Sequence, residues 1–236
     1  MKIINFKTLP STNQYLKEHY QELEEFTIIK ADNQTNGHGR LNRSWQVEPN
    51  TNLTFSILLK PKVDSSIIPL ISLVAGASVF KTLDKYVKCT IKWPNDIMIK
   101  DKKVTGILAE GVYSNTMEAL IIGIGINVNQ TIFNEEIKNK ATSLKLELYR
   151  DLNIDTLLQE FWVNFECLYN NYINGNNTYI KICKEHNYLK DKVVTYDNKE
   201  VKVLDISDNG NLEVLENNQI KELFFGEVTL QNIYHK

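Results

Sequence analysis

The sequence is poor in cysteine, and the few cysteines it has lie far apart. Cys89, Cys167 and Cys183 are the only three, and no two of them have C-x-x-C spacing. An odd and dispersed set argues against a disulfide framework and against a cysteine-rich zinc site. Free thiols are typical of a reducing compartment, so we expect a cytoplasmic protein.

Long apolar runs are also missing. The longest is SIIPLISLVAGASVF at 66–80, which is too short to span a membrane and contains Pro69. The first residues, MKIINFKTLPSTNQ, lack the apolar core of a signal peptide. We therefore expect no membrane segment.

Charge of one sign is not in excess. The sequence has 27 Lys and Arg against 29 Asp and Glu, a formal net charge of −2. This balance provides no overall positive field for nucleic acid, and we find no helix-turn-helix pattern ahead of the first strands. A chain of 236 residues with 42% hydrophobic residues can bury a sizeable core, so we expect a globular protein that does not bind DNA.

Helical and strand patterns alternate along the first two thirds of the chain. Ser11 and Gln14 have the spacing of a capping box and predict the start of a helix. Helical spacing of apolar residues predicts further helices at 66–86, 155–174 and 177–185. Strands are expected at 26–31, 53–60, 89–93, 96–100, 104–114 and 117–129. The last three should form an antiparallel meander with a tight turn at Asp101-Lys102, and 32–51 should be a long loop.

The pattern changes after Leu189. Short β-prone stretches alternate with polar turns at Asp197-Asn198, Asn209-Gly210 and Asn217-Asn218. This predicts a small all-β unit of four or five strands. We therefore divide the chain into a larger N-terminal domain, 1–187, which would carry any catalytic site, and a C-terminal β domain, 188–236.

The segment NQTNGHGRLNRSWQ, 33–46, places two glycines among arginines and a tryptophan. Gly37 and Gly39 allow the backbone to approach a ligand closely, and Arg40 and Arg43 offer donors suited to phosphate or carboxylate. Trp45 could stack on a planar ring. The segment is neither a Walker loop nor a dinucleotide fingerprint, and taken alone it is more typical of a solvated turn.

A second segment, KWPNDIMIKDKKVTGILAEG at 92–111, is harder to explain as plain surface. Trp93 and Pro94 end a predicted strand and are followed by an amide and a carboxylate. Asp96 could cap backbone donors, or it could help to hold Mg²⁺ or ligand hydroxyls, and both alternatives stay open. Lys103 lies beside the predicted hairpin turn, where lysines are commonly solvated.

Together, several motifs in this order resemble the biotin protein ligase family, in its short form without a DNA-binding domain. They are STNQYL at 11–16, QTNGHGRLNRSW at 34–45, KWPNDIMIKDKKVTGILAE at 92–110, GIGINVN at 123–129 and the C-terminal GEV. The resemblance implies an α+β fold. A mixed sheet flanked by helices, as in class II aminoacyl-tRNA synthetase-like biotin and lipoate ligases, would be followed by a small SH3-like β-barrel.

The resemblance also implies a reaction. Biotin and ATP, with Mg²⁺, would give biotinyl-5′-AMP, and the biotinyl group would pass to a lysine of a biotin carboxyl carrier domain of a carboxylase. A lipoate–protein ligase shares the fold and the adenylate chemistry, and a non-catalytic biotin-sensing regulator is a further alternative. A homodimer is compatible with the sequence.

Site residues are carried over from the family one position at a time. Arg40 and Lys103 match its catalytic residues. Both would belong to the biotin pocket and to the ATP and adenylate site. The other residues of the biotin pocket would be Ser11, Thr12, Asn13, Gln34, His38 and Gly39. The other residues of the ATP and adenylate site would be Arg43, Trp45, Asn95, Asp96 and Asn127.

The loop departs from the family in part. His38 and Leu41 stand where the family commonly has arginine, and Asn42 stands where glycine is common. For Gly123 and Gly125 we expect close packing in a core strand rather than contact with a ligand, and ligand proximity only at Asn127.

Overall fold

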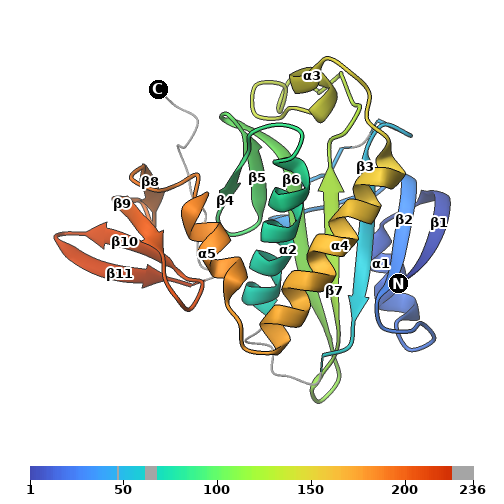
Figure 1. Ribbon diagram of the computed structural model, residues 1–236, viewed down its shortest axis with the longest axis horizontal. Coiled ribbons are helices and arrows are strands. Elements are labelled where there is room, and N and C mark those ends of the chain that lie inside the picture. Colours follow the sequence, from blue (N-terminus) through green and yellow to red (C-terminus); the bar gives the residue numbers. More distant parts are fainter. Residues whose placement is uncertain (47, 62–67, 225–236) are drawn as a thin grey trace.

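The computed structural model describes residues 1–46, 48–61 and 68–224. A seven-stranded sheet lies at its centre, in the order β1-β2-β3-β7-β6-β5-β4 (Figure 1). Its strands are β1 (Lys2–Leu9), β2 (Thr27–Gln34), β3 (Leu53–Leu59), β4 (Thr90–Lys92), β5 (Asp96–Ile99), β6 (Lys102–Tyr113) and β7 (Met117–Ile126). β1 and β2 pair in parallel, and the other neighbours pair antiparallel. The sheet is therefore mixed, and the predicted meander from β5 to β7 is confirmed. β4 adds a further antiparallel strand to it.

The β1 strand is not among the predicted strands. It lies at the edge of the sheet, and its side chains are exposed or half-buried without regular alternation. Its parallel pairing runs from Lys2 opposite Thr27 to Leu9 opposite Gln34. This pairing satisfies the backbone of β2 and extends that strand into the segment predicted as loop, so the prediction for 32–34 is wrong.

The hairpin between β5 and β6 turns one residue earlier than predicted. The turn is at Lys100-Asp101, where Lys100 has a φ of 54°, and β6 already begins at Lys102. Lys103 is therefore part of a strand, so the sheet fixes the position of its backbone.

Helices cover both faces of the sheet (Figure 1). One face carries α2 (Ile68–Leu83), α4 (Ile154–Ile173) and α5 (Thr178–Glu185), close to the predicted ranges, of which 66–67 lie outside the described residues. The opposite face carries α1 (Thr12–His19), and a short α3 (Leu144–Leu148) follows β7. Trp162 in α4 is buried, as predicted.

A separate antiparallel sheet follows α5, in the order β11-β10-β9-β8. Its strands are β8 (Val193–Tyr196), β9 (Lys199–Ile206), β10 (Leu212–Glu216) and β11 (Gln219–Leu223). The turn residues Asp197, Asn198, Asn217 and Asn218 all have positive φ, which suits tight hairpins. The predicted β unit is confirmed with four strands, and the GEV segment lies outside the described residues.

The two sheets share one continuous apolar core. Trp93, before β5, donates its indole N–H to the carbonyl of Gly210, in the turn between β9 and β10 of the small sheet, at 2.9 Å, and this bond is buried. The boundary at 187/188 stays a prediction. Across the described part of the chain, no helix has the length and apolar character needed to cross a membrane.

Candidate active site

Glycines on two neighbouring strands open a hollow on the face of the sheet that α1 covers. Gly106 on β6 pairs with Gly125 on β7, and Gly123 lies two residues away, on the same face as Gly125. A Cβ atom at Gly123 would lie 2.3 Å from the Asn13 carbonyl oxygen, and one at Gly125 would lie 2.4 Å from the Trp45 indole. The bare backbone at these glycines therefore forms the floor of a pocket, which we call the glycine floor, and α1 and the loop between β2 and β3 pack against it.

The side of the pocket next to α1 is lined by uncharged polar groups, which we call the neutral end: Ser11, Thr12, Asn13 and Gln34. Ser11 is the N-cap of α1, with its Oγ accepting from the Gln14 N–H at 3.4 Å. The Gln14 side chain bonds Glu18 instead of returning to Ser11, so only half of the predicted capping box forms. Ser11, Thr12 and Asn13 are at most 6% exposed, so their positions are set by packing.

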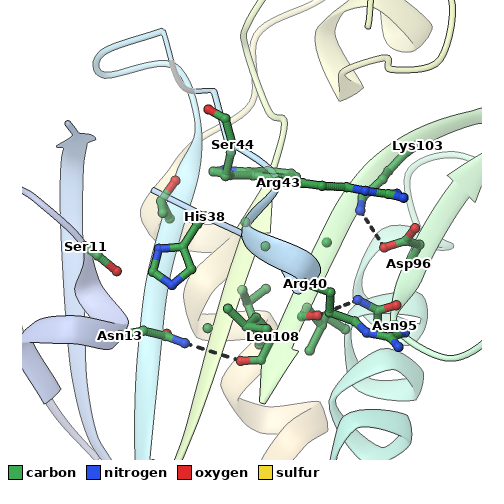
Figure 2. A pocket seen from close by; sticks show the side chains of 18 of the residues that line it. Ser11, Asn13, His38, Arg40, Arg43, Ser44, Asn95, Asp96, Lys103 and Leu108 are labelled. Carbon is green, nitrogen blue, oxygen red and sulfur yellow. Dashed lines mark hydrogen bonds and ion pairs between the residues drawn. The ribbon is translucent and has the colours of Figure 1, made fainter. Parts of the chain in front are cut away.

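The other side is lined by positive charge, which we call the cationic end: Arg40, Arg43, Lys92 and Lys103. Arg40, Lys92 and Lys103 all interact with one carboxylate, that of Asp96, and Arg43 lies close to Arg40 and Lys92. The Lys103 ammonium lies 2.6 Å from Asp96 Oδ1 (Figure 2). Burial lowers the pKa of Arg40 and of Lys92, and the nearby Asp96 charge opposes this shift in both. Four cations against one anion make this end suited to a polyphosphate or a carboxylate.

Lys92 is not among the predicted site residues. It ends β4, directly opposite Asp96 in the register, and it lines the pocket. The sequence did hold a signal for Lys92. It directly precedes Trp93-Pro94, and the next predicted strand begins at Asp96 and returns beside it, which brings Lys92 close to a predicted site residue.

The loop between β2 and β3 folds back on itself over the glycine floor. Gly39 N–H donates to the Arg43 carbonyl at 2.8 Å, and Trp45 N–H donates to the Gly37 carbonyl at 2.9 Å. The turn between them holds Leu41 at a φ of 56°. The Trp45 indole N–H is buried without a hydrogen-bond partner among the described residues, so it offers a donor to the pocket.

The remaining predicted residues divide into two groups. His38, Gly39, Asn95 and Asp96 line the pocket, and Asn95 Nδ2 donates to the Ile107 carbonyl at 2.7 Å. Asn127 does not line it. Its side chain is buried and donates to the Thr142 carbonyl at 3.0 Å. Gly123 and Gly125 pack closely against Asn13 and Trp45, as expected, and they also line the pocket, whereas Asn127 does not.

The site contains few groups that could bind a metal. Within the described residues no cluster of three or more His, Cys, Asp or Glu could hold an ion. Asp96 is the one carboxylate among the described residues of the pocket lining. Magnesium commonly uses one or two carboxylates together with substrate phosphates, so Asp96 is sufficient only for an ion that arrives with a phosphate.

A profile of the Biotin/lipoate A/B protein ligase family matches residues 5–127. The chain belongs to this family. All the described residues that line the pocket lie inside the match, and so do the seven strands from β1 to β7 apart from the first residues of β1.

Relatives within the family are similar over different lengths. The Bifunctional ligase/repressor BirA of Bacillus subtilis is 32% identical over 216 residues, which are 87% of this chain and 66% of that protein. The Biotin--[acetyl-CoA-carboxylase] ligase of Mycobacterium tuberculosis is 31% identical over 127 residues, which are 50% of this chain and 44% of that protein. The chain thus spans less than two thirds of the length of these curated relatives.

The solved structures extend the likeness to almost the whole chain. The biotin protein ligase from Aquifex aeolicus in complex with biotin and ATP has a TM-score of 0.88 and 31% identity, and the match covers 98% of both chains. That match includes the small C-terminal sheet, so the predicted fold class is confirmed.

Proposed function

We propose that this chain is an ATP-dependent biotin–protein ligase. The observation that carries the proposal is a single pocket with two chemically different ends. Hydroxyl and amide groups at the neutral end suit an uncharged cyclic urea, and the cationic end suits a carboxylate beside a triphosphate. The similar ligase from Aquifex aeolicus is described in complex with both biotin and ATP, which supports the same pair of substrates here.

In the first step, the biotin carboxylate would attack the α-phosphate of ATP and release pyrophosphate. Both reactants are anions, and Arg40 and Lys103 would reduce their repulsion and stabilise the charge that develops in the transition state. Neither residue needs to form a covalent bond to substrate. The rate gain would come from positioning and electrostatics.

In the second step, the amine of an acceptor lysine would attack the mixed anhydride and release AMP. The acceptor we propose is the biotin carboxyl carrier domain of a carboxylase, in line with the relative named Biotin--[acetyl-CoA-carboxylase] ligase. The folded loop over the pocket would keep water from the anhydride until the acceptor arrives. A cytoplasmic location and a homodimer stay predictions.

Mg²⁺ is part of this proposal. Asp96, with its single carboxylate in the lining, would hold the ion together with the phosphates of ATP. The bound ion would neutralise phosphate charge and help pyrophosphate to leave.

The test is biotin-dependent exchange of radiolabelled pyrophosphate into ATP in the presence of Mg²⁺. We expect exchange with biotin, and much less with lipoate at the same concentration. Preferred exchange with lipoate would assign the chain to the other activity within the family. Biotin binding with no exchange at saturating ATP would favour the non-catalytic regulator.

A further inference from the structure

One charged side chain lies directly behind the neutral end and belongs to no assigned site. Glu110 follows Leu108 by two residues on β6 and is partly exposed. One of its oxygens accepts from Asn13 Nδ2 at 2.7 Å, and the other accepts from Lys17 Nζ at 2.6 Å. We propose that Glu110 sets the donor and acceptor direction of the neutral end, so that this end selects a ligand that brings a ring N–H. The ligand meant is the cyclic urea of biotin, so this inference rests on the proposed function.

The orientation of the Asn13 amide is set by the Glu110 carboxylate. An ionised carboxylate only accepts hydrogen bonds, so Asn13 must turn its NH₂ group toward Glu110. The same NH₂ group also points at the Leu108 carbonyl, at 3.5 Å (Figure 2). The Asn13 carbonyl oxygen therefore faces the other way, toward the buried Ser56 hydroxyl at 2.5 Å. Glu110 thus determines that Asn13 presents its carbonyl oxygen, and not its NH₂ group, to the hydrogen-bond network that begins at Ser56.

The other end of the network is fixed as well. The Thr12 backbone N–H donates to Gln34 Oε1 at 2.7 Å, so Gln34 presents its carbonyl oxygen and not its NH₂ group. Both termini of the network are consequently acceptors, and two hydroxyls, those of Ser56 and Thr12, lie between them.

Counting protons shows the result. Three oxygen–oxygen contacts link these groups: Ser56 to Asn13 at 2.5 Å, Ser56 to Thr12 at 2.6 Å and Thr12 to Gln34 at 3.0 Å. The two hydroxyls supply two protons, so one contact always joins two lone pairs. Such a contact in a buried site is unfavourable.

A ligand can supply the missing proton. Thr12 and Gln34 both line the pocket. When Ser56 donates to Asn13 and Thr12 donates to Ser56, the contact without a proton is the one between Thr12 Oγ1 and Gln34 Oε1. A ligand N–H directed between these two oxygens is shared by both and offsets their repulsion. With Asn13 reversed, its NH₂ group would provide the third proton, and the network would be satisfied with no ligand. Glu110 is therefore a positioning residue that keeps the site short of one donor.

Ligand discrimination provides the test, with biotin and the two analogues in which one ring N–H is replaced by oxygen. Binding would be measured by calorimetry without ATP, because this separates the neutral end from catalysis. We expect the wild type to bind the weaker analogue about 10- to 100-fold less tightly than biotin, as for a buried acceptor left without its donor. In Glu110→Leu the difference should shrink to within about threefold, because Asn13 is free to reverse.

Two further variants separate direction from packing. Lys17→Met removes the salt bridge but leaves the carboxylate, so the discrimination should stay as in the wild type. The double variant Asn13→Asp with Glu110→Gln exchanges the two partners. The new glutamine amide would donate to the new carboxylate, and that carboxylate would still present an acceptor to Ser56. Discrimination of at least about tenfold should therefore persist in the double variant, and this test remains available if Glu110→Leu does not fold.

The outcomes are distinct from those of the proposed function. Unchanged discrimination in a folded Glu110→Leu, or its loss in the exchanged double variant, would contradict the role of Glu110. Loss of discrimination in Lys17→Met would assign the effect to the salt bridge and would also contradict it. Wild-type protein that discriminates among these ligands but gives no pyrophosphate exchange would instead contradict the ligase activity alone.

Discussion

The two ends of the pocket are built in different ways. The neutral end is carried by the first turn of α1 and the end of β2, where its groups are nearly or partly buried and bonded to one another. The cationic end combines strand residues with a loop whose Arg43 is exposed, and its charges converge on one carboxylate. Recognition of a defined small ring benefits from fixed groups, whereas a polyphosphate needs charge whose exact placement can adjust.

The largest effect should come from the cationic end. Lys103→Ala removes an ammonium held by the sheet at 2.6 Å from Asp96. We expect adenylate formation to fall about 1000-fold, because one well-placed electrostatic contact is worth this much in a transition state. Biotin binding without ATP should change far less.

Rapid-quench measurement of biotinyl-AMP would provide the rate for this variant. Lys102→Ala is the matched control, because Lys102 directly precedes Lys103 in the chain, is exposed and does not line the pocket. A rate for Lys103→Ala near that of the control would remove Lys103 from the reaction.

Substitutions of intermediate effect, on KM, should distinguish the two ends of the glycine floor. Gly123→Ala places a methyl group against Asn13, and Gly125→Ala places one against the Trp45 indole. The first should raise the KM for biotin about tenfold and leave the KM for ATP nearly unchanged, and the second should do the reverse, since each displaces the groups of one end. Steady-state exchange kinetics with each substrate varied would show this, and equal effects on both constants would mean that the two ends are not independent.

The smallest effect should come from the loop turn. Leu41 is 72% exposed and has a φ of 56°, a conformation that costs a side-chain-bearing residue about 1 kcal/mol. Leu41→Gly should relieve most of this cost and lower the KM for ATP by at most about twofold, because the chain entropy that glycine loses offsets about half or more of the gain. Leu41→Ala is the control, because it removes the same side chain but keeps the Cβ atom. A similar gain in both variants would show that backbone strain is not the cause.

Much of the framework could be predicted because its signals are local. The apolar periodicity of α4 and the antiparallel order of β5 to β7 could be predicted from the spacing of residues. The neutral end was predicted through the family resemblance. Only Ser11 also had a local signal, as a helix cap, whereas Gln34 ends β2 in a stretch that was predicted as loop.

The rest depends on contacts that sequence spacing does not show. β1 is an edge strand whose pairing with β2 comes from the whole sheet. Lys92 becomes part of the pocket only because β5 returns alongside β4. The glycine floor did have a signal: Gly123 and Gly125 are two residues apart and must share one face of β7, so two missing side chains there mean a hollow.

The hydrogen bond between Trp93 and Gly210 has a consequence for the newly made chain. A ribosome releases the seven strands of the large sheet before it has made Gly210. Until then the Trp93 side of the pocket lacks the carbonyl to which its indole is bonded. The pocket wall is thus completed by one of the last parts of the chain, and the finished site requires that synthesis has reached the small sheet.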